Sequence, residues 1–421
     1  MSRARRLLSS ALATALAAII IGVTAAAGGG PSIATLTWNP MLGTTSGPLA
    51  NDAVWAIAVD GNDVYVGGKF TDFAGIPAAD RIVKWNGTDQ RWEALELDGS
   101  SNGSITAGTV YDIDVDDGVL YVGGNITVDT GAVDCNNLVT FTLATSTWAG
   151  FGTCPDSQII DPSTPVYTVE KIPSGRLYVG GNFEDANGDS TFDYGIYGTL
   201  AAGNWTWSGL GDDGAGGPAL NQFVSNVVVH PDGGVLLTGD FGLAGGVVGA
   251  NSNVRFDTAL DPNFVPQDTP AVTFYGAYNT GTQLFASGWE GAYLYLGANS
   301  WRQLCDTELG AGGTTWGALS LVSADVLLVG GNTLYACDIS DGGSATEVPS
   351  AGTVRALASY RGATIVGGTS TVGTAGDYIA LLGEVLPYTN SDSRQTTDAI
   401  ILLVTLTAFT ALAGTQLLRR A

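Results

Sequence analysis

The side chains that could do chemistry in this 421-residue sequence are almost all carboxylates. There are 40 acidic residues against 16 lysines and arginines, and a single histidine, His230. One histidine excludes multi-histidine metal centres, and any catalysis that needs an imidazole would have to use His230. The net charge of −24 argues against nucleic acid as a partner, because a phosphate backbone requires a basic face.

One row of carboxylates, Asp112, Asp114 and Asp116, alternates along a predicted strand. Alternate residues of a strand share a face, so these acids repel one another unless they are protonated, hydrogen-bonded or bound to a cation. Asp112 and Asp114 are therefore candidates for a ligand site. Hydrogen bonds to the backbone of a neighbouring strand would also explain the row, and we favour that structural explanation.

A second acid-rich segment is a predicted loop with oxygen-bearing side chains at alternate positions. Asp185, Asn187 and Asp189 have the 1, 3, 5 spacing of a calcium loop, and Asp193 follows closely. An EF-hand would carry a bidentate acid where this chain has Ile196. We therefore favour a solvated turn and keep calcium, the only cofactor that the sequence suggests, as the alternative.

The other candidate residues are few. His230 stands beside a Pro-Asp-Gly turn, which predicts an exposed side chain. Trp289 and Glu290 interrupt a repeated glycine position and are candidates for a sugar-stacking platform, with an exposed aromatic in a degenerate repeat as the alternative. Glycoside hydrolysis needs only two carboxylates, so composition does not exclude a hydrolase.

The four cysteines allow three pairings. We favour a disulfide between Cys135 and Cys154 within one repeat and another between Cys305 and Cys337 across two neighbouring repeats. A zinc site is disfavoured, because the chain contains no CxxC spacing.

The elements that must position these side chains come from a unit repeated along the chain. Four clear copies begin at Val54, Val110, Val166 and Val224, and read VWAIAVDGNDVYVGGKF, VYDIDVDDGVLYVGGNIT, VYTVEKIPSGRLYVGGNF and VSNVVVHPDGGVLLTGDF. Three weaker copies end at Gly288, Gly331 and Gly368. The glycine pairs are interpreted as architecture, at places where a bend or close backbone approach disallows a Cβ.

Each unit contains four short runs rich in β-branched and aromatic residues, separated by turn residues. Four antiparallel strands repeated about every 50 residues are typical of β-propeller blades. The last unit has only three strands, and Thr35–Asn39 resembles the missing fourth. The fold class is therefore all-β, a propeller of seven blades over residues 33–385 closed by its N-terminal strand, with six or eight blades as alternatives.

The VYVGGxF core with a downstream tryptophan resembles the delta-sixty-type repeat propellers of bacterial surface proteins. It is similar to repeats of the fungal cortical polarity marker as well. The resemblance covers residues 33–385 and is strongest in the first four units. It implies an extracellular, kelch-like propeller and supplies no catalytic residues.

The N-terminus has the features of a secretory signal peptide over residues 1–27. Three arginines precede an apolar stretch that ends in small residues, where signal peptidase cleaves. An uncleaved N-terminal anchor is the weaker alternative. Export would also permit the disulfides proposed above.

The C-terminus resembles a sortase cell-wall sorting signal. The motif and its spacer occupy residues 386–398, an apolar stretch long enough to span a membrane occupies 399–418, and a basic tail occupies 419–421. The motif itself consists of Leu386, Pro387, Tyr388, Thr389 and Asn390. Asn390 stands where the family has glycine. The resemblance implies cleavage after Thr389 and attachment to the envelope, and retention by the membrane helix is the alternative.

These features together predict an exported, surface-anchored propeller that binds protein or glycan ligands at the cell surface, with sortase and the membrane as further partners. The alternative function is a secreted carbohydrate-active hydrolase or lyase that uses carboxylates on a propeller face.

Overall fold

A computed structural model describes residues 36–42, 48–95, 103–130, 134–153, 157–248, 250, 252–259, 264–266, 273–288, 291–306, 317–339, 345–349, 351–373 and 377–383. The chain divides into two compact units, Met1–Glu384 and Val385–Ala421, and only the first contains described residues. The expected signal peptide, sorting motif and apolar C-terminal stretch lie outside the described residues. Within the described part of the chain, no helix has the length and apolar character needed to cross a membrane.

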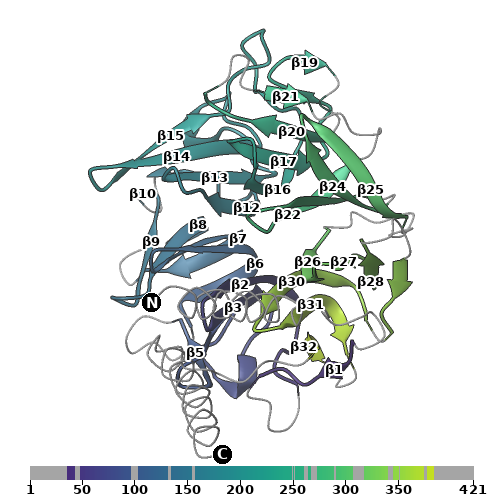
Figure 1. Cartoon of the computed structure of the whole chain (residues 1–421). Coiled ribbons are helices and arrows are strands. Elements are labelled where there is room, and N and C mark those ends of the chain that lie inside the picture. Colours follow the sequence, from purple (N-terminus) through teal and green to yellow (C-terminus); the bar gives the residue numbers. More distant parts are fainter. Residues whose placement is uncertain are drawn as a thin grey trace, which may run out of the picture. The chain divides into compact units, whose positions relative to one another are not determined.

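Seven four-stranded antiparallel sheets form the blades of a β-propeller. The first strands of the blades lie around the centre of Figure 1 and the fourth strands lie at the periphery. Blade 1 contains β2 (Val54–Asp60), β3 (Asp63–Gly68), β4 (Ile82–Asn86) and β5 (Arg91–Ala94). Blade 2 contains β6 (Ile105–Asp116), β7 (Val119–Asp129), β8 (Asp134–Thr142) and β9 (Thr147–Gly150). Blade 3 contains β12 (Val166–Lys171), β13 (Arg176–Gly181), β14 (Gly195–Ala201) and β15 (Asn204–Gly209).

The remaining blades have the same strand order. Blade 4 contains β16 (Val224–Val229), β17 (Val235–Gly239), β20 (Asn253–Phe256) and β21 (Phe264–Pro266). Blade 5 contains β22 (Phe274–Asn279), β23 (Leu284–Gly288), β24 (Gly291–Gly297) and β25 (Ser300–Asp306). Blade 6 contains β26 (Leu319–Ser323), β27 (Val326–Gly330), β28 (Leu334–Asp338) and β29 (Ala345–Glu347). Blade 7 contains β30 (Val354–Tyr360), β31 (Ala363–Val372), β32 (Asp377–Leu382) and β1 (Trp38–Asn39).

Short elements occupy some of the loops between these strands. Two small hairpins are formed by β10 (Gly152–Thr153) with β11 (Ser157–Gln158), and by β18 (Leu243–Ala244) with β19 (Val247–Val248). Single 3-10 turns occupy Phe73–Gly75 and Ala186–Gly188 at matching positions of blades 1 and 3.

The ring closes through the N-terminal strand. β1 pairs antiparallel with β32, with Trp38 opposite Leu382 and Asn39 opposite Leu381. First strands of consecutive blades contact each other around the ring, and β30 of blade 7 contacts β2 of blade 1. The prediction of seven blades closed by an N-terminal strand is therefore confirmed, and the alternatives of six and eight blades are wrong.

The glycine pairs let neighbouring blades approach closely. A Cβ on Gly67 would lie 2.5 Å from Cγ1 of Val110, which belongs to β6 in the neighbouring blade 2. A Cβ on Gly68 would lie 2.1 Å from the carbonyl oxygen of Ala53. The same two contacts recur at Gly180 and Gly181 in blade 3. The architectural interpretation of these glycines is confirmed.

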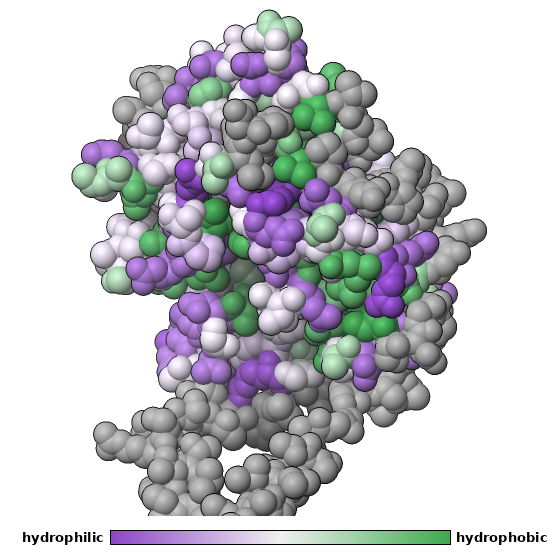
Figure 2. Space-filling view, turned by 45° about the horizontal axis from the view of Figure 1, so that its top comes forward, coloured by the Kyte–Doolittle hydropathy of each residue, from purple (hydrophilic) through white to green (hydrophobic). Residues whose placement is uncertain are grey.

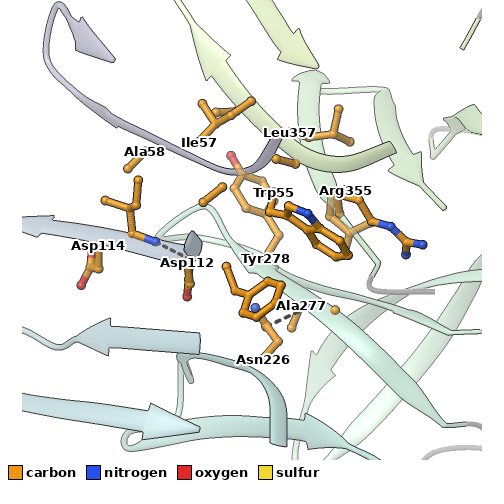
Figure 3. A pocket seen from close by; sticks show the side chains of 18 of the residues that line it. Trp55, Ile57, Ala58, Asp112, Asp114, Asn226, Ala277, Tyr278, Arg355 and Leu357 are labelled. Atoms are coloured by element: carbon orange, nitrogen blue, oxygen red, sulfur yellow. Dashed lines mark hydrogen bonds between the residues drawn. The ribbon is translucent and has the colours of Figure 1, made fainter. Parts of the chain in front are cut away.

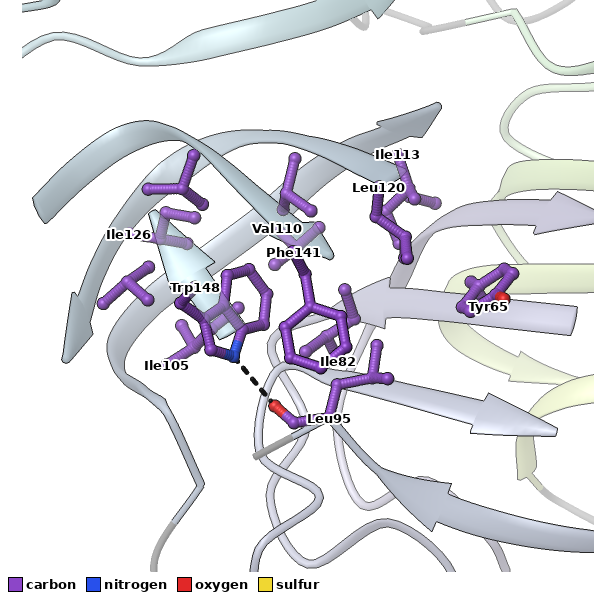
Figure 4. Packing of buried hydrophobic residues seen from close by; sticks show 14 of the residues in the cluster. Tyr65, Ile82, Leu95, Ile105, Val110, Ile113, Leu120, Ile126, Phe141 and Trp148 are labelled. Atoms are coloured by element: carbon purple, nitrogen blue, oxygen red, sulfur yellow. Dashed lines mark hydrogen bonds between the residues drawn. The ribbon is translucent and has the colours of Figure 1, made fainter. Parts of the chain in front are cut away.

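The core lies between the blades rather than in one central mass. The cluster shared by blades 1 and 2 includes Tyr65, Leu120, Phe141 and Trp148, all buried (Figure 4). The Trp148 indole N–H donates to the carbonyl oxygen of Leu95 at 3.0 Å, so even this polar atom has a partner across the blade boundary. Each blade is thus stabilised chiefly by its two neighbours.

Candidate functional site

A β-bulge at the start of the first strand gives six of the seven blades one side chain that lines the central channel. In blades 1 to 5 and blade 7 the pairing between the first and second strands shifts by one residue at this point. A bulge redirects the extra side chain away from the regular alternation of the strand. The side chains at these positions, which we call the bulge ring, are Trp55, Tyr111, Tyr167, Ser225, Tyr275 and Arg355, and all of them line one pocket.

Aromatic members of the bulge ring contact one another edge to face. The ring centroids of Trp55 and Tyr111 are 5.3 Å apart, and those of Tyr111 and Tyr167 are 5.6 Å apart. Tyr167 in turn contacts Phe223 of blade 4 at 5.9 Å. We call these four residues the aromatic arc. Because each ring is braced by the next, the arc is a preformed surface.

Arg355 stands beside the blade 1 end of the aromatic arc. Its guanidinium lies 5.4 Å from the centroid of the Trp55 ring, which is the geometry of a cation–π contact (Figure 3). Burial lowers the pKa of Arg355 from its ordinary value, but an arginine stays charged at physiological pH. The mouth of the channel therefore combines apolar ring surface with one positive charge.

The pocket behind the bulge ring is the central channel itself, with a volume of about 560 Å³. All seven blades contribute lining residues from their first strands or the residues just before them. Figure 3 shows Asp112 and Asp114 on β6, Trp55 on the adjacent strand β2, and Arg355 on β30, which contacts β2 in turn. A cavity of this size can hold a small ligand or one chain segment.

Asp112 and Asp114 are held by the first strand of blade 3. Asp112 Oδ2 accepts a hydrogen bond from the backbone N–H of Val169 at 2.8 Å, and Asp114 Oδ2 accepts one from Lys171 N–H at 2.6 Å. Their second oxygens accept from the following residues, Ile113 and Val115. Both carboxylates also line the channel. The structure thus places the two ligand candidates in the pocket and gives them backbone partners there.

A third carboxylate, Glu170 of β12, lines the same channel, and no sequence motif had pointed to it. Its Oε1 accepts from Val229 N–H of blade 4 at 3.3 Å. Burial raises the pKa of Glu170 well above its ordinary value, and the charges of Asp114 and Asp112 raise it further. The three acids therefore share one electrostatic environment.

Burial also shifts the pKa values of the other two carboxylates. It raises the pKa of Asp112 to about 7, against the hydrogen bond from Val169, and the charge of Asp114 adds to the rise. Burial raises the pKa of Asp114 as well, opposed by the bonds from Lys171 and Val115. At neutral pH Asp112 is therefore poised between its protonated and ionised forms.

The predicted calcium residues form a loop that uses its own side chains. Asp193 Oδ1 accepts from the backbone N–H of Asp185 at 2.8 Å, and Asp189 Oδ1 accepts from Thr191. Blade 1 builds the same loop, in which Asp80 accepts from Asp72, with Ala74 at the position of Asn187. No group of three or more acidic, histidine or cysteine side chains in the described part of the chain is arranged to hold a metal ion. Calcium binding here stays a prediction without a geometric site.

His230 is buried, with 1% of its surface exposed, so the expectation of an exposed turn residue is wrong. Blade 5 covers the turn, and the imidazole packs against the Tyr295 ring at 4.7 Å. Its Nδ1 accepts from Asp232 N–H at 3.1 Å, and the Tyr295 hydroxyl is bonded to the Asp232 carboxylate. His230 is not among the residues that line the channel pocket.

The other predicted positions divide between described and undescribed residues. Cys305 of β25 and Cys337 of β28 form the expected disulfide between blades 5 and 6, with Cα atoms 5.9 Å apart. Cys135 is disulfide-bonded, but its proposed partner Cys154 lies outside the described residues, so that pairing stays a prediction. Trp289 and Glu290 also lie outside them.

The described surface offers little apolar area outside the channel. Its large exposed hydrophobic residues are Leu200, Leu243 and Leu296, which belong to three different blades. In Figure 2 hydrophobic residues of the visible face are interspersed with hydrophilic ones. The bulge ring brings four aromatic side chains, Trp55, Tyr111, Tyr167 and Tyr275, to the lining of one pocket.

Comparisons with known proteins identify the fold. Neither a protein-family model nor a curated protein matches the sequence. A catalytically inactive virginiamycin B lyase from Staphylococcus aureus, solved with quinupristin, matches with a TM-score of 0.53 and 10% identity over 83% of this chain and 100% of its own. An extracellular domain from B. thetaiotaomicron, described as part of a hybrid two component system, matches with a TM-score of 0.54 and 13% identity.

A second extracellular domain from B. thetaiotaomicron matches with a TM-score of 0.52 and 12% identity. This match covers 84% of this chain and 40% of that protein. The match with the first domain covers 83% of this chain and 42% of that protein. At such identities the likeness shows the propeller fold and nothing of the chemistry. The function must be argued from the channel.

Proposed function

We propose that this protein is an exported propeller, anchored in the cell envelope, that binds a protein or glycan ligand at the mouth of its central channel. The observation that carries the proposal is the aromatic arc of Trp55, Tyr111, Tyr167 and Phe223. Rigid aromatic rings supply large contact areas at low entropic cost, which is why they concentrate at binding sites.

The repeat architecture supports a display role as well. The bulge ring varies from blade to blade, while the second glycine of the repeat recurs in all seven units. A constant frame with variable side chains at one mouth is what a recognition surface requires. The resemblance to delta-sixty-type repeats and the extracellular propellers among the fold neighbours support the same class of function.

Binding can be tested by screening the protein on glycan and peptide arrays and repeating the screen with Trp55→Ala. We expect retention of the best ligand to fall at least about tenfold, since truncating a central aromatic anchor costs about 2 kcal/mol or more. Trp207→Ala, on the outer strand of blade 3, is the matched control and should bind normally. Equal binding by the Trp55 variant would refute the channel mouth as the site.

Anchoring rests on the sorting motif at residues 386–390, where Asn390 replaces the glycine of the family. Mass spectrometry of envelope digests should recover a peptide that ends at Thr389 and carries a wall fragment. Recovery of an intact C-terminal tail from the mature protein would instead support retention by the membrane helix.

A second candidate function, a carbohydrate-active hydrolase or lyase, is favoured by one observation. Asp112 and Glu170 line the channel with raised pKa values, and an ionisable group poised near neutrality can serve as a general acid or base. A hydrolase and lyase screen tests this function directly. Turnover that disappears in Glu170→Gln but not in Asp116→Asn would make the protein an enzyme.

A further inference from the structure

We propose that the ligand group entering the channel is an organic cation, the ammonium of a lysine side chain on a protein ligand, held between the aromatic arc and the carboxylates of Asp112, Asp114 and Glu170. This inference rests on the proposed function, because it names the chemistry recognised at the same site.

The first step of the argument is the depth of the carboxylates. On β6 Tyr111 belongs to the aromatic arc, and Asp112 and Asp114 follow one and three residues further down the strand. At about 3.4 Å per residue, the carboxylates begin about 3 to 10 Å below the arc. The aromatic rings and the acids therefore follow one another along the same wall of the channel. Ring faces attract cations, so the route is favourable along its length.

The second step is that the fold does not need these charges. The first strands of blades 3, 4 and 5 each donate a backbone N–H to a side chain of the blade before it. Blade 3 makes this bond with the Thr168 hydroxyl, which accepts from Val227 at 3.1 Å, and blade 4 makes it with the Asn226 amide oxygen, which accepts from Ala277 at 3.1 Å. Neutral acceptors are sufficient for the contact between blades, so the carboxylates of blades 2 and 3 serve something else.

The third step counts the charged groups that face these acids. On β6 they are Asp112, Asp114 and, at the outer end, Asp116; on β12 they are Glu170 and Lys171. The Lys171 ammonium lies 3.4 Å from Asp116, and its charge also lowers the pKa of Asp114. Among the described residues that line the pocket from the other strands, only Arg355 of blade 7 is charged, and it lies beside Trp55 of blade 1. The blade 2 and blade 3 side of the channel therefore holds three acids against one lysine, which also pairs with Asp116.

The length of the pathway favours lysine over an amino sugar. Lysine carries its ammonium at the end of a flexible four-carbon stem, so it can place the charge below the arc while its backbone stays at the mouth. An amino sugar carries the amine directly on the ring, which would have to enter the channel whole. The net charge of −24 also favours association with a basic partner.

A cation among these acids must couple to protons. Burial and mutual repulsion raise the pKa values of Asp112 and Glu170, so the empty channel retains protons at neutral pH. A bound ammonium stabilises the ionised carboxylates and lowers those pKa values, which releases protons. A neutral ligand has no such effect. Proton release therefore separates recognition of a cation from stacking on the arc alone.

The test is calorimetric titration of the protein with a short glycine peptide that contains one lysine, in buffers of different ionisation enthalpy. The same peptide with an acetylated lysine and glucosamine are the comparison ligands. We expect the lysine peptide to bind at least about tenfold more tightly than the acetylated one, with proton release at pH 7 and tighter binding at pH 8 than at pH 6.

Two isosteric variants locate the charge. Asp112→Asn and Glu170→Gln keep an oxygen acceptor for the backbone N–H, so both should fold, and each should weaken lysine-peptide binding at least about tenfold and reduce proton release. Asp117→Asn, in the exposed turn that follows β6, should leave both quantities unchanged.

The other outcomes overturn the inference. Equal binding of the free and acetylated peptides, or no binding of either, would show that the channel does not recognise a cation. Tighter binding of glucosamine with proton release removes lysine as its source. Binding of neutral array ligands that depends on Trp55 without proton release leaves the proposed function intact and removes this inference, so the two failures are distinguishable.

Discussion

The Asp112 carboxylate accepts a backbone hydrogen bond for which the next two blades use a neutral side chain. Its buried charge destabilises the folded state. Burial raises its pKa from 3.8 to about 7. Between these two pH values the folded protein binds a proton that the unfolded chain has released. Stability must therefore fall as pH rises through this window, by at most about 1.4 kcal/mol per pH unit for one group.

The Asp112→Asn variant tests this pH-dependent loss of stability. Because the amide does not titrate, the variant should gain free energy of unfolding relative to the wild type between pH 5 and pH 8. Urea denaturation at the two pH values measures the gain, and Asp116→Asn is the control for loss of an acid on the same strand. A difference between variant and wild type that is the same at pH 5 and pH 8 would contradict the raised pKa.

Residue by residue, the sequence indicates the acids of the channel better than its aromatic arc. The alternation of Asp112 and Asp114 is visible in one strand, whereas Trp55 and Tyr111 join the pocket only because a bulge turns them inward. A bulge leaves no mark in hydrophobic periodicity. The available signal is a variable position directly after the first valine of each repeat. Glu170 is missed because a lone acid in a strand resembles any solvated side chain.

At the scale of the strand, the glycine pair sets how closely blades can approach. The first glycine faces a valine side chain of the next blade, which a new Cβ would have to displace. The second glycine faces a carbonyl oxygen of its own blade, which cannot shift without breaking the strand pairing. The two positions of the motif are therefore unequal, although the sequence repeats them as a unit.

Alanine substitutions should reveal this inequality. Gly68→Ala places a Cβ 2.1 Å from the Ala53 carbonyl oxygen and should destabilise the protein by about 3 kcal/mol or more. Gly67→Ala meets the Val110 methyl group at 2.5 Å and should cost about 1 to 3 kcal/mol. Gly242→Ala, with no atom within 4 Å of the new Cβ, is the control and should be near neutral. Chemical denaturation gives the ranking, and equal losses at Gly67 and Gly242 would refute the packing argument.

The disulfide between β25 and β28 is the covalent counterpart of these contacts. It joins blades 5 and 6, whose repeats are the most degenerate, across a sequence separation of 32 residues. The chain-entropy relation assigns such a loop about 3 to 4 kcal/mol. The double variant Cys305→Ser, Cys337→Ser should lose stability by that order in non-reducing denaturation. The reduced wild type should lose as much, and an undiminished midpoint in both samples would show that packing alone joins these blades.

For the whole molecule, the repeat predicts the ring because every blade needs two neighbours and the last unit has one strand too few. Counting the recurring second glycine of the repeat gives seven blades, and the tryptophan segment at the N-terminus supplies the missing strand, as β1 confirms. What the sequence does not indicate is how firmly so short a strand holds. Only two residues of β1 pair with β32, so other contacts must secure the closure.

The side chain that secures it is Asp377, at the start of β32. This buried carboxylate accepts the backbone N–H groups of Leu49 and Ala50, at 2.5 and 3.1 Å, in the segment that joins β1 to blade 1. Asp377→Ala leaves both donors buried without an acceptor, at about 1 to 3 kcal/mol each. We expect a loss of about 2 to 4 kcal/mol in the free energy of unfolding.

The location of the damage distinguishes a latch from an ordinary buried hydrogen bond. If Asp377 holds the ring closed, hydrogen exchange in Asp377→Ala should rise first at the amides of β32 and in the segment from Leu49 to Ala53, ahead of blades 2 to 5. Asp80→Ala removes a carboxylate that accepts an exposed N–H of Asp72, and it should cost less than about 1 kcal/mol with exchange unchanged at β32. Uniform acceleration across all blades would mean that the ring opens as one unit and that β1 closes it without this latch.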